Sequence, residues 1–213
     1  VIPSGVDSIE MAVFTGCTNL QSVRLEEGAT VIGEYMFLEC TSLSNVELPS
    51  TLTTIGNGAF KQCALETVCL PASVDSIGEY AFQNCTALKS VELPAGLKAL
   101  SRYVFNGCTS LGSIVLPDGL ETIGYSAFSN CTAMTSITMG DKIKSVGDGA
   151  FVNCEALADV CYKGSLSGWM RIDMLADTYP EETCPLSFAS RLYVDYGTDD
   201  QQIVTDLVVP EDI

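Results

Sequence analysis

The chain of 213 residues contains no histidine, and its 10 lysine and arginine residues face 27 aspartate and glutamate residues. Without histidine, the serine–histidine and cysteine–histidine pairs that activate a nucleophile cannot form. The shortage of basic residues gives a formal net charge of −17. Such a charge argues against binding to nucleic-acid phosphates or anionic membranes, and it is compatible with partners that carry basic patches.

Several other features are missing. No apolar run approaches the ~18–20 residues that cross a bilayer, so we expect no transmembrane segment. The phosphate-binding loop, the dinucleotide fingerprint and the calcium loop of EF-hands are all absent from the sequence. We therefore expect no catalytic residues, no cofactor and no metal site, and the protein is interpreted as not being an enzyme.

What the sequence does contain is a repeat of 22–23 residues, marked by a phenylalanine with a cysteine three positions later. The phenylalanines are Phe14, Phe37, Phe60, Phe82, Phe105, Phe128 and Phe151, and the cysteines are Cys17, Cys40, Cys63, Cys85, Cys108, Cys131 and Cys154. A fixed period of this size is typical of stacked-repeat proteins. These residues are interpreted as a structural spine that points into one continuous core.

Each unit reads approximately L-P-x-x-L-x-x-I-G-x-x-A-F-x-x-C-T-x-L-x-x-V-x. The alternation in Ser90-Val91-Glu92-Leu93 predicts a short strand, which the following proline ends. The segment Ile77–Phe82 predicts a brief extended piece followed by one helical or 3₁₀ turn. Gly78, a glycine that recurs at this position in most units, is expected to supply a turn. One unit alone buries too little apolar surface to offset its ordering entropy, so neighbouring units must stack on one another.

At this point the chain resembles the BspA-like class of leucine-rich repeat proteins over residues 1 to about 161. The resemblance implies a right-handed solenoid of the α/β class, mostly short strands with turns and short helical pieces, and a parallel sheet on its concave face. It also implies a surface-exposed or secreted protein, often bacterial and sometimes from protists. Adhesion and binding to host proteins are the activities that this family usually carries.

We expect residues 1–172 to form the repeat array, with seven units followed by a degenerate closing unit. In that last unit, Tyr162 takes the leucine position and Trp169 is expected to cover the open end of the core. Residues 173–213 are interpreted as an acidic cap and connector with one strand at Leu192–Val194. A further repeat is expected to begin near residue 204, because Val204, Leu207, Val209, Pro210 and Ile213 match the consensus, so the chain is expected to be a piece of a longer exported protein.

The cysteine column is interpreted as buried free thiols, because a regular stack does not offer disulfide geometry and a linear column does not suit tetrahedral zinc. Three cysteines lie outside this column: Cys69, Cys161 and Cys184. Cys69 and Cys161 are four units apart, too far to bond each other. A bridge between Cys161 and Cys184 stays open.

The outward positions of the long strands form the candidate binding surface on the concave face. Its members are Ser22, Arg24, Asn45, Glu47, Thr67, Ser90, Glu92, Ser113, Val115, Ser136 and Thr138, together with Cys69, Asp159 and Cys161 at the equivalent positions. A solenoid sheet is where extended partners usually dock. A featureless surface suited to close packing is the alternative. The tyrosines Tyr35, Tyr80 and Tyr103 are either a second interface or supports for the loop.

Three functions remain open. The first is a cell-surface module that binds a protein, such as a host matrix protein, or a glycan. The second is a spacer or scaffold that holds another domain away from the surface. The third is an accessory repeat region of a larger secreted enzyme.

Overall fold

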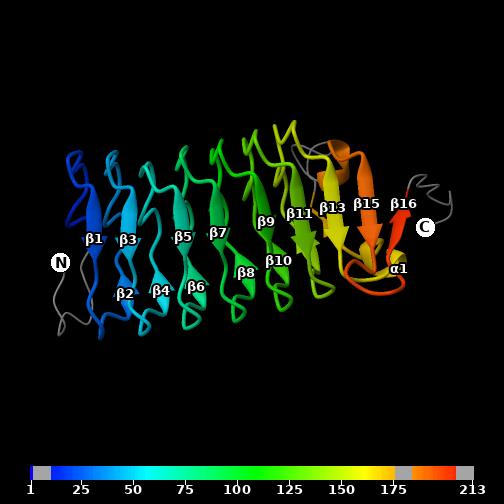
Figure 1. Cartoon of the computed structure of the whole chain (residues 1–213), viewed down its shortest axis with the longest axis horizontal. Coiled ribbons are helices and arrows are strands. Elements are labelled where there is room, and N and C mark those ends of the chain that lie inside the picture. Colours follow the sequence, from blue (N-terminus) through cyan, green and yellow to red (C-terminus); the bar gives the residue numbers. More distant parts are fainter. Residues whose placement is uncertain (2–10, 176–183, 205–213) are drawn as a thin grey trace.

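The computed structural model describes residues 1, 11–175 and 184–204, and it is a β-solenoid in which each unit contributes two strands to two separate ladders (Figure 1). The long strands are β1 (Ser22–Arg24), β3 (Asn45–Glu47), β5 (Thr67–Cys69), β7 (Ser90–Glu92), β9 (Ser113–Val115), β11 (Ser136–Met139), β13 (Asp159–Tyr162), β15 (Arg191–Val194) and β16 (Gln202–Val204). The short strands are β2 (Val31–Ile32), β4 (Thr54–Ile55), β6 (Ser76–Ile77), β8 (Ala99–Leu100), β10 (Thr122–Ile123), β12 (Ser145–Val146) and β14 (Asp173–Met174). The solenoid predicted from the repeat is confirmed.

The register of both ladders follows the sequence period. Val23 lies opposite Val46, and Ile137 lies between Ile114 and Val160, all on parallel strands. Pairing along the two rows of strands is interrupted between β3 and β5, between β7 and β9 and between β6 and β8, so the described strands form five sheets. Within each sheet the strands are parallel, and equivalent side chains of successive units lie side by side. The exception is β16, which pairs antiparallel with β15.

The core is a single column of stacked phenylalanine rings, flanked by the aliphatic residues of the strands. Neighbouring rings lie 5.4–5.7 Å apart between centroids with interplanar angles of 5–15°. From Phe37 to Phe151 every ring in the column is fully buried. Phe14 is half-buried and Cys17 is exposed, so the first members depart from the expected buried spine. Both lie at the N-terminal end of the described stack, where residues 2–10 fall outside the described part of the chain.

The cysteine column ties each unit to the unit before it. The Cys40 thiol donates to the carbonyl oxygen of Phe14 at 3.1 Å, and the Cys108 thiol donates to Phe82 at 3.2 Å. The same bond recurs in the other units at 3.0–3.2 Å. A buried cysteine therefore fills the core as a small apolar group and also satisfies a buried carbonyl.

The turn predicted after each short strand is present as a series of hydrogen-bonded turns and does not form a 3₁₀ or α-helix in the described repeats. Alternate backbone amides in this segment donate within the unit and to the next unit; Phe37 N donates to Ala59 O at 2.8 Å, and Cys40 N donates to Phe37 O at 3.2 Å. Two positions per unit, represented by Tyr35 (φ 54°) and Glu39 (φ 60°), adopt the left-handed conformation. A left-handed residue every fourth position stops any helix from continuing.

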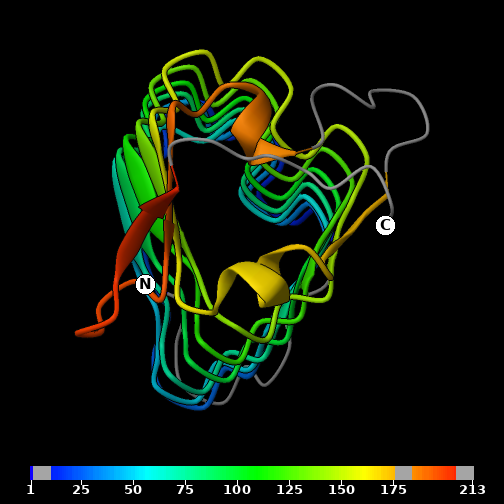
Figure 2. The same cartoon turned by 90° about the vertical axis from the view of Figure 1, so that its right-hand side faces the viewer.

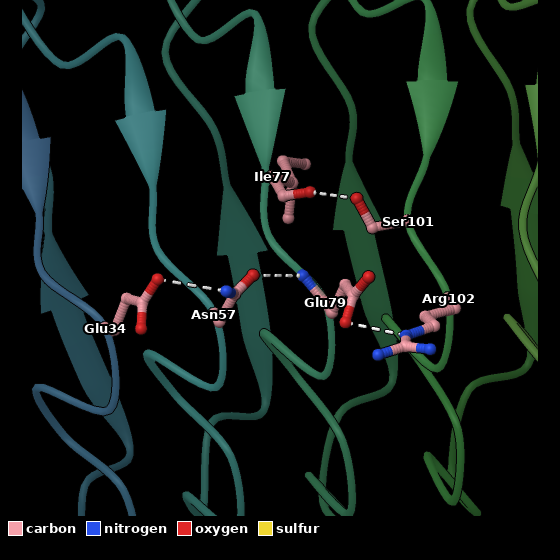
Figure 3. Close-up of polar contacts among 6 residues, drawn as sticks. All are labelled: Glu34, Asn57, Ile77, Glu79, Ser101 and Arg102. Carbon is pink, nitrogen blue, oxygen red and sulfur yellow. Dashed lines mark hydrogen bonds and ion pairs between the residues drawn. The ribbon is translucent and has the colours of Figure 1, made fainter.

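The recurring glycine has a different role from the turn that the sequence suggested. A Cβ atom built at Gly56, Gly78, Gly124 or Gly147 would lie 2.5–2.7 Å from a backbone nitrogen of the preceding unit. None of these four glycines has a positive φ. Glycine is favoured at these four positions because neighbouring backbones approach closely. The fifth unit carries Ser101 at this position, so the packing there accommodates a Cβ atom, and the Ser101 hydroxyl donates to Ile77 O at 2.5 Å (Figure 3).

We expect Gly78→Ala to lower the free energy of unfolding by about 1–3 kcal/mol, the usual cost of overpacking a site that cannot relax. The added methyl group would lie 2.5 Å from Asn57 N, and a backbone atom cannot move aside without shifting the whole unit. Gly96→Ala is the matched control, since a Cβ at Gly96 meets no atom within 4 Å. Urea unfolding of both variants checks the prediction, which equal stabilities would contradict.

The C-terminal end of the stack closes with a short helix. Helix α1 (Leu166–Trp169) begins after Ser165, whose hydroxyl accepts from Gly168 N at 3.3 Å. Trp169 is buried and packs edge-on against Tyr162, with ring centroids 5.5 Å apart. In Figure 2, viewed along the stack, α1 lies across the end of the superimposed coils. The expected cover of the core by Trp169 matches this position.

Both ladders continue beyond residue 172, the expected end of the array. Strand β14 pairs in parallel with β12, and β15, which contains the predicted strand at residues 192–194, pairs in parallel with β13. A short 3₁₀ helix, η1 (Pro185–Ser187), precedes β15. Val204 lies in β16 rather than at the start of a new unit, and the other residues of the expected further repeat lie outside the described residues. The division of the chain at residue 172 stays a prediction.

Candidate binding surface on the long-strand sheet

The outward side chains of the long strands form two straight columns on one surface, which we call the sheet face. One column contains Ser22, Asn45, Thr67, Ser90, Ser113, Ser136, Asp159 and Arg191, and the other contains Arg24, Glu47, Cys69, Glu92, Val115, Thr138, Cys161 and Tyr193. Alternation along each strand places them opposite the buried valine and isoleucine positions. The structure thus brings all the predicted surface residues onto one face.

Exposure on the sheet face falls toward the C-terminal end. The members on β1 to β9 are exposed, Ser136 and Thr138 are half-buried, and Cys161 is buried. Tyr196, which follows β15, lies near the Cys161 thiol, and its ring packs against Tyr193 with centroids 6.0 Å apart. The open part of the sheet face therefore extends over β1 to β9.

A hollow of ≈ 490 Å³ lies on this open part, over β7 and β9. Ser90, Glu92, Ser113 and Val115 line it from the strands, together with Val91, Leu93, Ala95, Leu116, Pro117, Asp118 and Lys163. Val115 is 62% exposed. The other large exposed hydrophobic residues of the described chain lie near its two ends, at Val1, Met11, Val13, Leu166, Met170, Leu175 and Ile203. Among the described residues, Val115 is thus the large hydrophobic residue that is exposed in the middle of the repeat array.

Charged groups border the hollow on both sides. On one side, Glu92 Oε2 accepts from the Cys69 thiol at 3.1 Å, a bond that raises the pKa of Cys69. On the other side, Lys163 Nζ lies 2.6 Å from Asp118 Oδ1, and this ion pair spans two units. The rim therefore presents two carboxylates and one ammonium group around an apolar floor.

Two arginines of the sheet face form ion pairs away from the hollow. Arg24 Nε lies 3.6 Å from Glu47 Oε2 and 3.5 Å from Glu26 Oε1. At the other end, Arg191 donates to both carboxylate oxygens of Asp159, at 2.5 and 2.8 Å, which raises the pKa of Arg191. Exposed pairs of this kind add little stability, so they chiefly fix side-chain positions.

The tyrosine row lies away from the sheet face, after the short strands. The rings of Tyr80 and Tyr103 stack at 4.9 Å, and Tyr125 meets Tyr103 edge-on at 5.2 Å. Lys61 and Arg102 lie over the Tyr80 ring, 5.6 and 5.8 Å from its centroid. With the ring faces occupied by neighbours, this geometry favours the interpretation that the tyrosines support the loops.

Beside this row, polar side chains link four successive units, as Figure 3 shows. Asn57 Nδ2 donates to Glu34 Oε1 at 3.0 Å, and Asn57 Oδ1 accepts from Glu79 N at 2.8 Å. Arg102 Nε lies 2.6 Å from Glu79 Oε2. These side-chain contacts satisfy the polar groups beside the closely packed glycines.

All ten cysteines are free thiols, including Cys161 and Cys184, between which a bridge had been left open. Burial raises the pKa of Cys85 and Cys154 to about 12, and it also raises that of Cys63, Cys108 and Cys131. Within residues 11–175 and 184–204, no three Cys, Asp or Glu side chains gather as potential metal ligands. No helix in the same described segments is long and apolar enough to span a bilayer.

Lys163 and Tyr196 are positions at the candidate surface that the sequence did not reveal. Lys163 stands where most units have the proline that ends the long strand, and it reaches back across one unit to Asp118. The replacement of proline by lysine was visible in the sequence, but the length of that reach was not. Tyr196 follows a degenerate unit, where the repeat no longer predicts where a side chain lies.

The comparisons with known proteins agree with this geometry. A sequence model described as BspA type leucine rich repeat region, in 6 copies, matches residues 1–89 and 53–169. The chain therefore belongs to the BspA-type leucine-rich repeat family. No relative with a curated description was found by sequence.

Three solved structures are similar to the chain. A leucine-rich repeat protein from Eubacterium ventriosum is 31% identical, with 65% of this chain and 38% of that chain covered and a TM-score of 0.61. A leucine rich cell surface protein from Faecalibacterium prausnitzii is 25% identical, covering 78% of this chain and 66% of that chain, with a TM-score of 0.47. The leucine-rich repeat protein of T. pallidum is 31% identical, covering 62% and 75%, with a TM-score of 0.48.

The chain thus spans 66% of the Faecalibacterium protein and 38% of the Eubacterium protein. It is a leucine-rich repeat module, and members of this family are typically non-catalytic.

Proposed function

We propose that the chain is a non-catalytic module that binds a protein partner, outside the cell or on its surface, through the open part of the sheet face. The observation that carries this proposal is the hollow over β7 and β9, where Val115 is exposed on an otherwise small and polar face. An apolar centre within a polar rim is the usual anatomy of a protein–protein interface. The cell-surface wording printed for the Faecalibacterium protein supports the location.

The charge of the chain narrows the class of partner. With a net charge of −17, the protein attracts surfaces that carry lysine and arginine, and Glu92 and Asp118 place two of its carboxylates at the rim of the hollow. Charge complementarity of this kind mainly raises the association rate and makes binding sensitive to salt. Basic extracellular proteins, including host matrix proteins, are therefore the first partners to test, and adhesion is the role that follows.

The test is a binding screen of immobilised matrix proteins and glycans, repeated with paired variants. Val115→Asp places a charge in the hollow, whereas Thr132→Asp places the same charge at an exposed loop position off the sheet face. We expect the first variant to weaken binding at least about tenfold, the effect of ~1.4 kcal/mol, and the second to bind as the parent does. Glu92→Gln should lower the association rate at low salt.

Two results would reject the sheet-face proposal: no ligand in the screen, or equal binding by Val115→Asp and Thr132→Asp. The first result would favour the spacer role, which the uniform column of serine and threonine and the continuous core already suit. An accessory role in a larger enzyme would be tested by assaying the module for binding to that enzyme's substrate.

A further inference from the structure

A second hollow, of ≈ 300 Å³, lies in the edge formed by the loops that lead into the long strands. Its lining residues are Thr41, Gln62, Cys63, Ala64, Asn84, Thr86 and Ala87. They come from three successive units, and the middle unit is the one with 22 residues, which lacks a residue between Cys63 and Leu65. In Figure 1 the loop before β5 stands lower than the loops before β3 and β7. The missing residue leaves a notch in an otherwise even edge.

Within the described part of the chain, two of the polar side chains around the notch, Asn84 and Thr86, lack hydrogen bonds that some of their equivalents make. Thr109 Oγ1 donates to Thr86 O and Thr132 Oγ1 donates to Thr109 O, at 3.4 and 3.5 Å, and Asn153 Nδ2 donates to Asn130 Oδ1 at 2.8 Å. The hollow is lined by two hydroxyl groups, of Thr41 and Thr86, and by two carboxamide groups, of Gln62 and Asn84. The Asn84 Oδ1 atom also lies close to Gly107 of the next unit.

The chemistry of this lining defines its ligand. Hydroxyl and carboxamide groups both donate and accept hydrogen bonds. No charged side chain lines the hollow, so neither an anion nor a cation would find a counter-charge there. A purely apolar ligand would leave the amides buried and unpaired, which is costly. Ala64, Ala87 and Cys63 supply a small apolar floor.

We propose that this notch binds a neutral sugar residue, as a free saccharide or as the end of a glycan chain. A sugar offers several hydroxyl groups that donate and accept, and its C–H face suits a floor of small apolar groups. The volume lies at the lower end of the ~300–1,000 Å³ that ligand pockets occupy, so the notch takes one sugar residue rather than an extended chain. The site is separate from the sheet face and does not depend on the function proposed for that surface.

The test uses methyl glycosides of neutral hexoses and N-acetylhexosamines, titrated into the whole chain and followed by amide chemical shifts and calorimetry. Asn84→Gly removes one carboxamide while keeping a residue that tolerates the φ of 58°. Asn130→Gly, at the equivalent position of a regular unit with a φ of 63°, is the matched control. Insertion of threonine between Cys63 and Ala64 restores the 23-residue unit and fills the notch.

We expect at least one neutral sugar to shift the amide resonances of Gln62, Asn84 and Thr86 with saturation. Asn84→Gly and the insertion should each weaken this binding tenfold or more, and Asn130→Gly should leave it unchanged. The proposal is overturned if no neutral sugar shifts these resonances, if acidic sugars bind and neutral ones do not, or if Asn84→Gly binds as the parent does. Circular dichroism checks that the insertion variant is folded, and Asn84→Gly decides the outcome if it is not.

Discussion

Replacing Phe105 by alanine is expected to lower the free energy of unfolding by about 3–5 kcal/mol, the usual cost of removing a fully buried aromatic ring. The ring of Phe105 stacks between Phe82 and Phe128, with centroids 5.6 and 5.7 Å away. Both contacts are lost together, at the centre of the stack. In a solenoid each unit packs mainly on its neighbours, so a weakened fifth unit weakens the link between the units on either side of it.

The shape of the transition distinguishes this prediction from ordinary destabilisation. With the central contact weakened, the units before and after Phe105 should unfold separately, and the thermal transition should broaden or split in calorimetry. Phe14→Ala is the matched control, because that ring is half-buried and stands at the end of the described column. It should cost less and leave one transition. A single sharp transition of Phe105→Ala at the parent midpoint would refute the one-dimensional stack.

The sequence predicts the core and the sheet face well because both depend on period alone. Once the repeat aligns Val68 with Val91, parallel pairing places Thr67 beside Ser90 and Cys69 beside Glu92, as the structure has them. A residue's neighbours in such a stack are its own equivalents one repeat away. The columns could therefore be written down without knowledge of the path of the chain between the strands.

The turns could not be predicted in the same way. The left-handed position that Glu39 represents holds Gly16, Gln62, Asn84, Gly107, Asn130 and Asn153 in the other units. Glycine and asparagine tolerate this conformation, and their recurrence was the available signal. The role of the recurring glycine was predicted incorrectly for another reason. Glycine is favoured there because the backbone of the adjacent unit lies close to it, and a sequence does not show how closely two units approach.

The notch and the C-terminal end mark the places where the period fails. The missing residue after Cys63 was visible, but the loss of hydrogen bonds by Asn84 and Thr86 depends on the neighbouring units. Past Tyr162 the consensus ends, and with it the basis for placing Tyr196 or predicting the antiparallel strand β16. In this chain the repeats specify the scaffold, and the departures from the repeat specify the candidate sites.

A rise in pH above about 8.5 is expected to destabilise the protein steeply, because of the buried thiols. Burial holds the pKa of Cys85 and Cys154 at about 12 and raises that of Cys63, Cys108 and Cys131, while a thiol in the unfolded chain has a pKa near ~8.5. Above that pH the unfolded chain binds fewer protons than the folded protein, so the free energy of unfolding falls as pH rises. Below it both states are protonated, and the thiols add no pH dependence.

Each such thiol contributes a slope of ~1.4 kcal/mol per pH unit, and five together contribute ~7 kcal/mol per pH unit. Since domains are typically stable by about 5–15 kcal/mol, unfolding is expected near pH 10. Urea unfolding at pH 7.5, 8.5 and 9.5 under a reductant measures the slope. Cys131→Ala should reduce it by ~1.4 kcal/mol per pH unit, whereas Cys17→Ala, at the exposed end of the column, should not. Charge repulsion in this acidic chain would act equally in both variants, so an unchanged slope in Cys131→Ala would assign the alkaline instability to repulsion instead of the thiols.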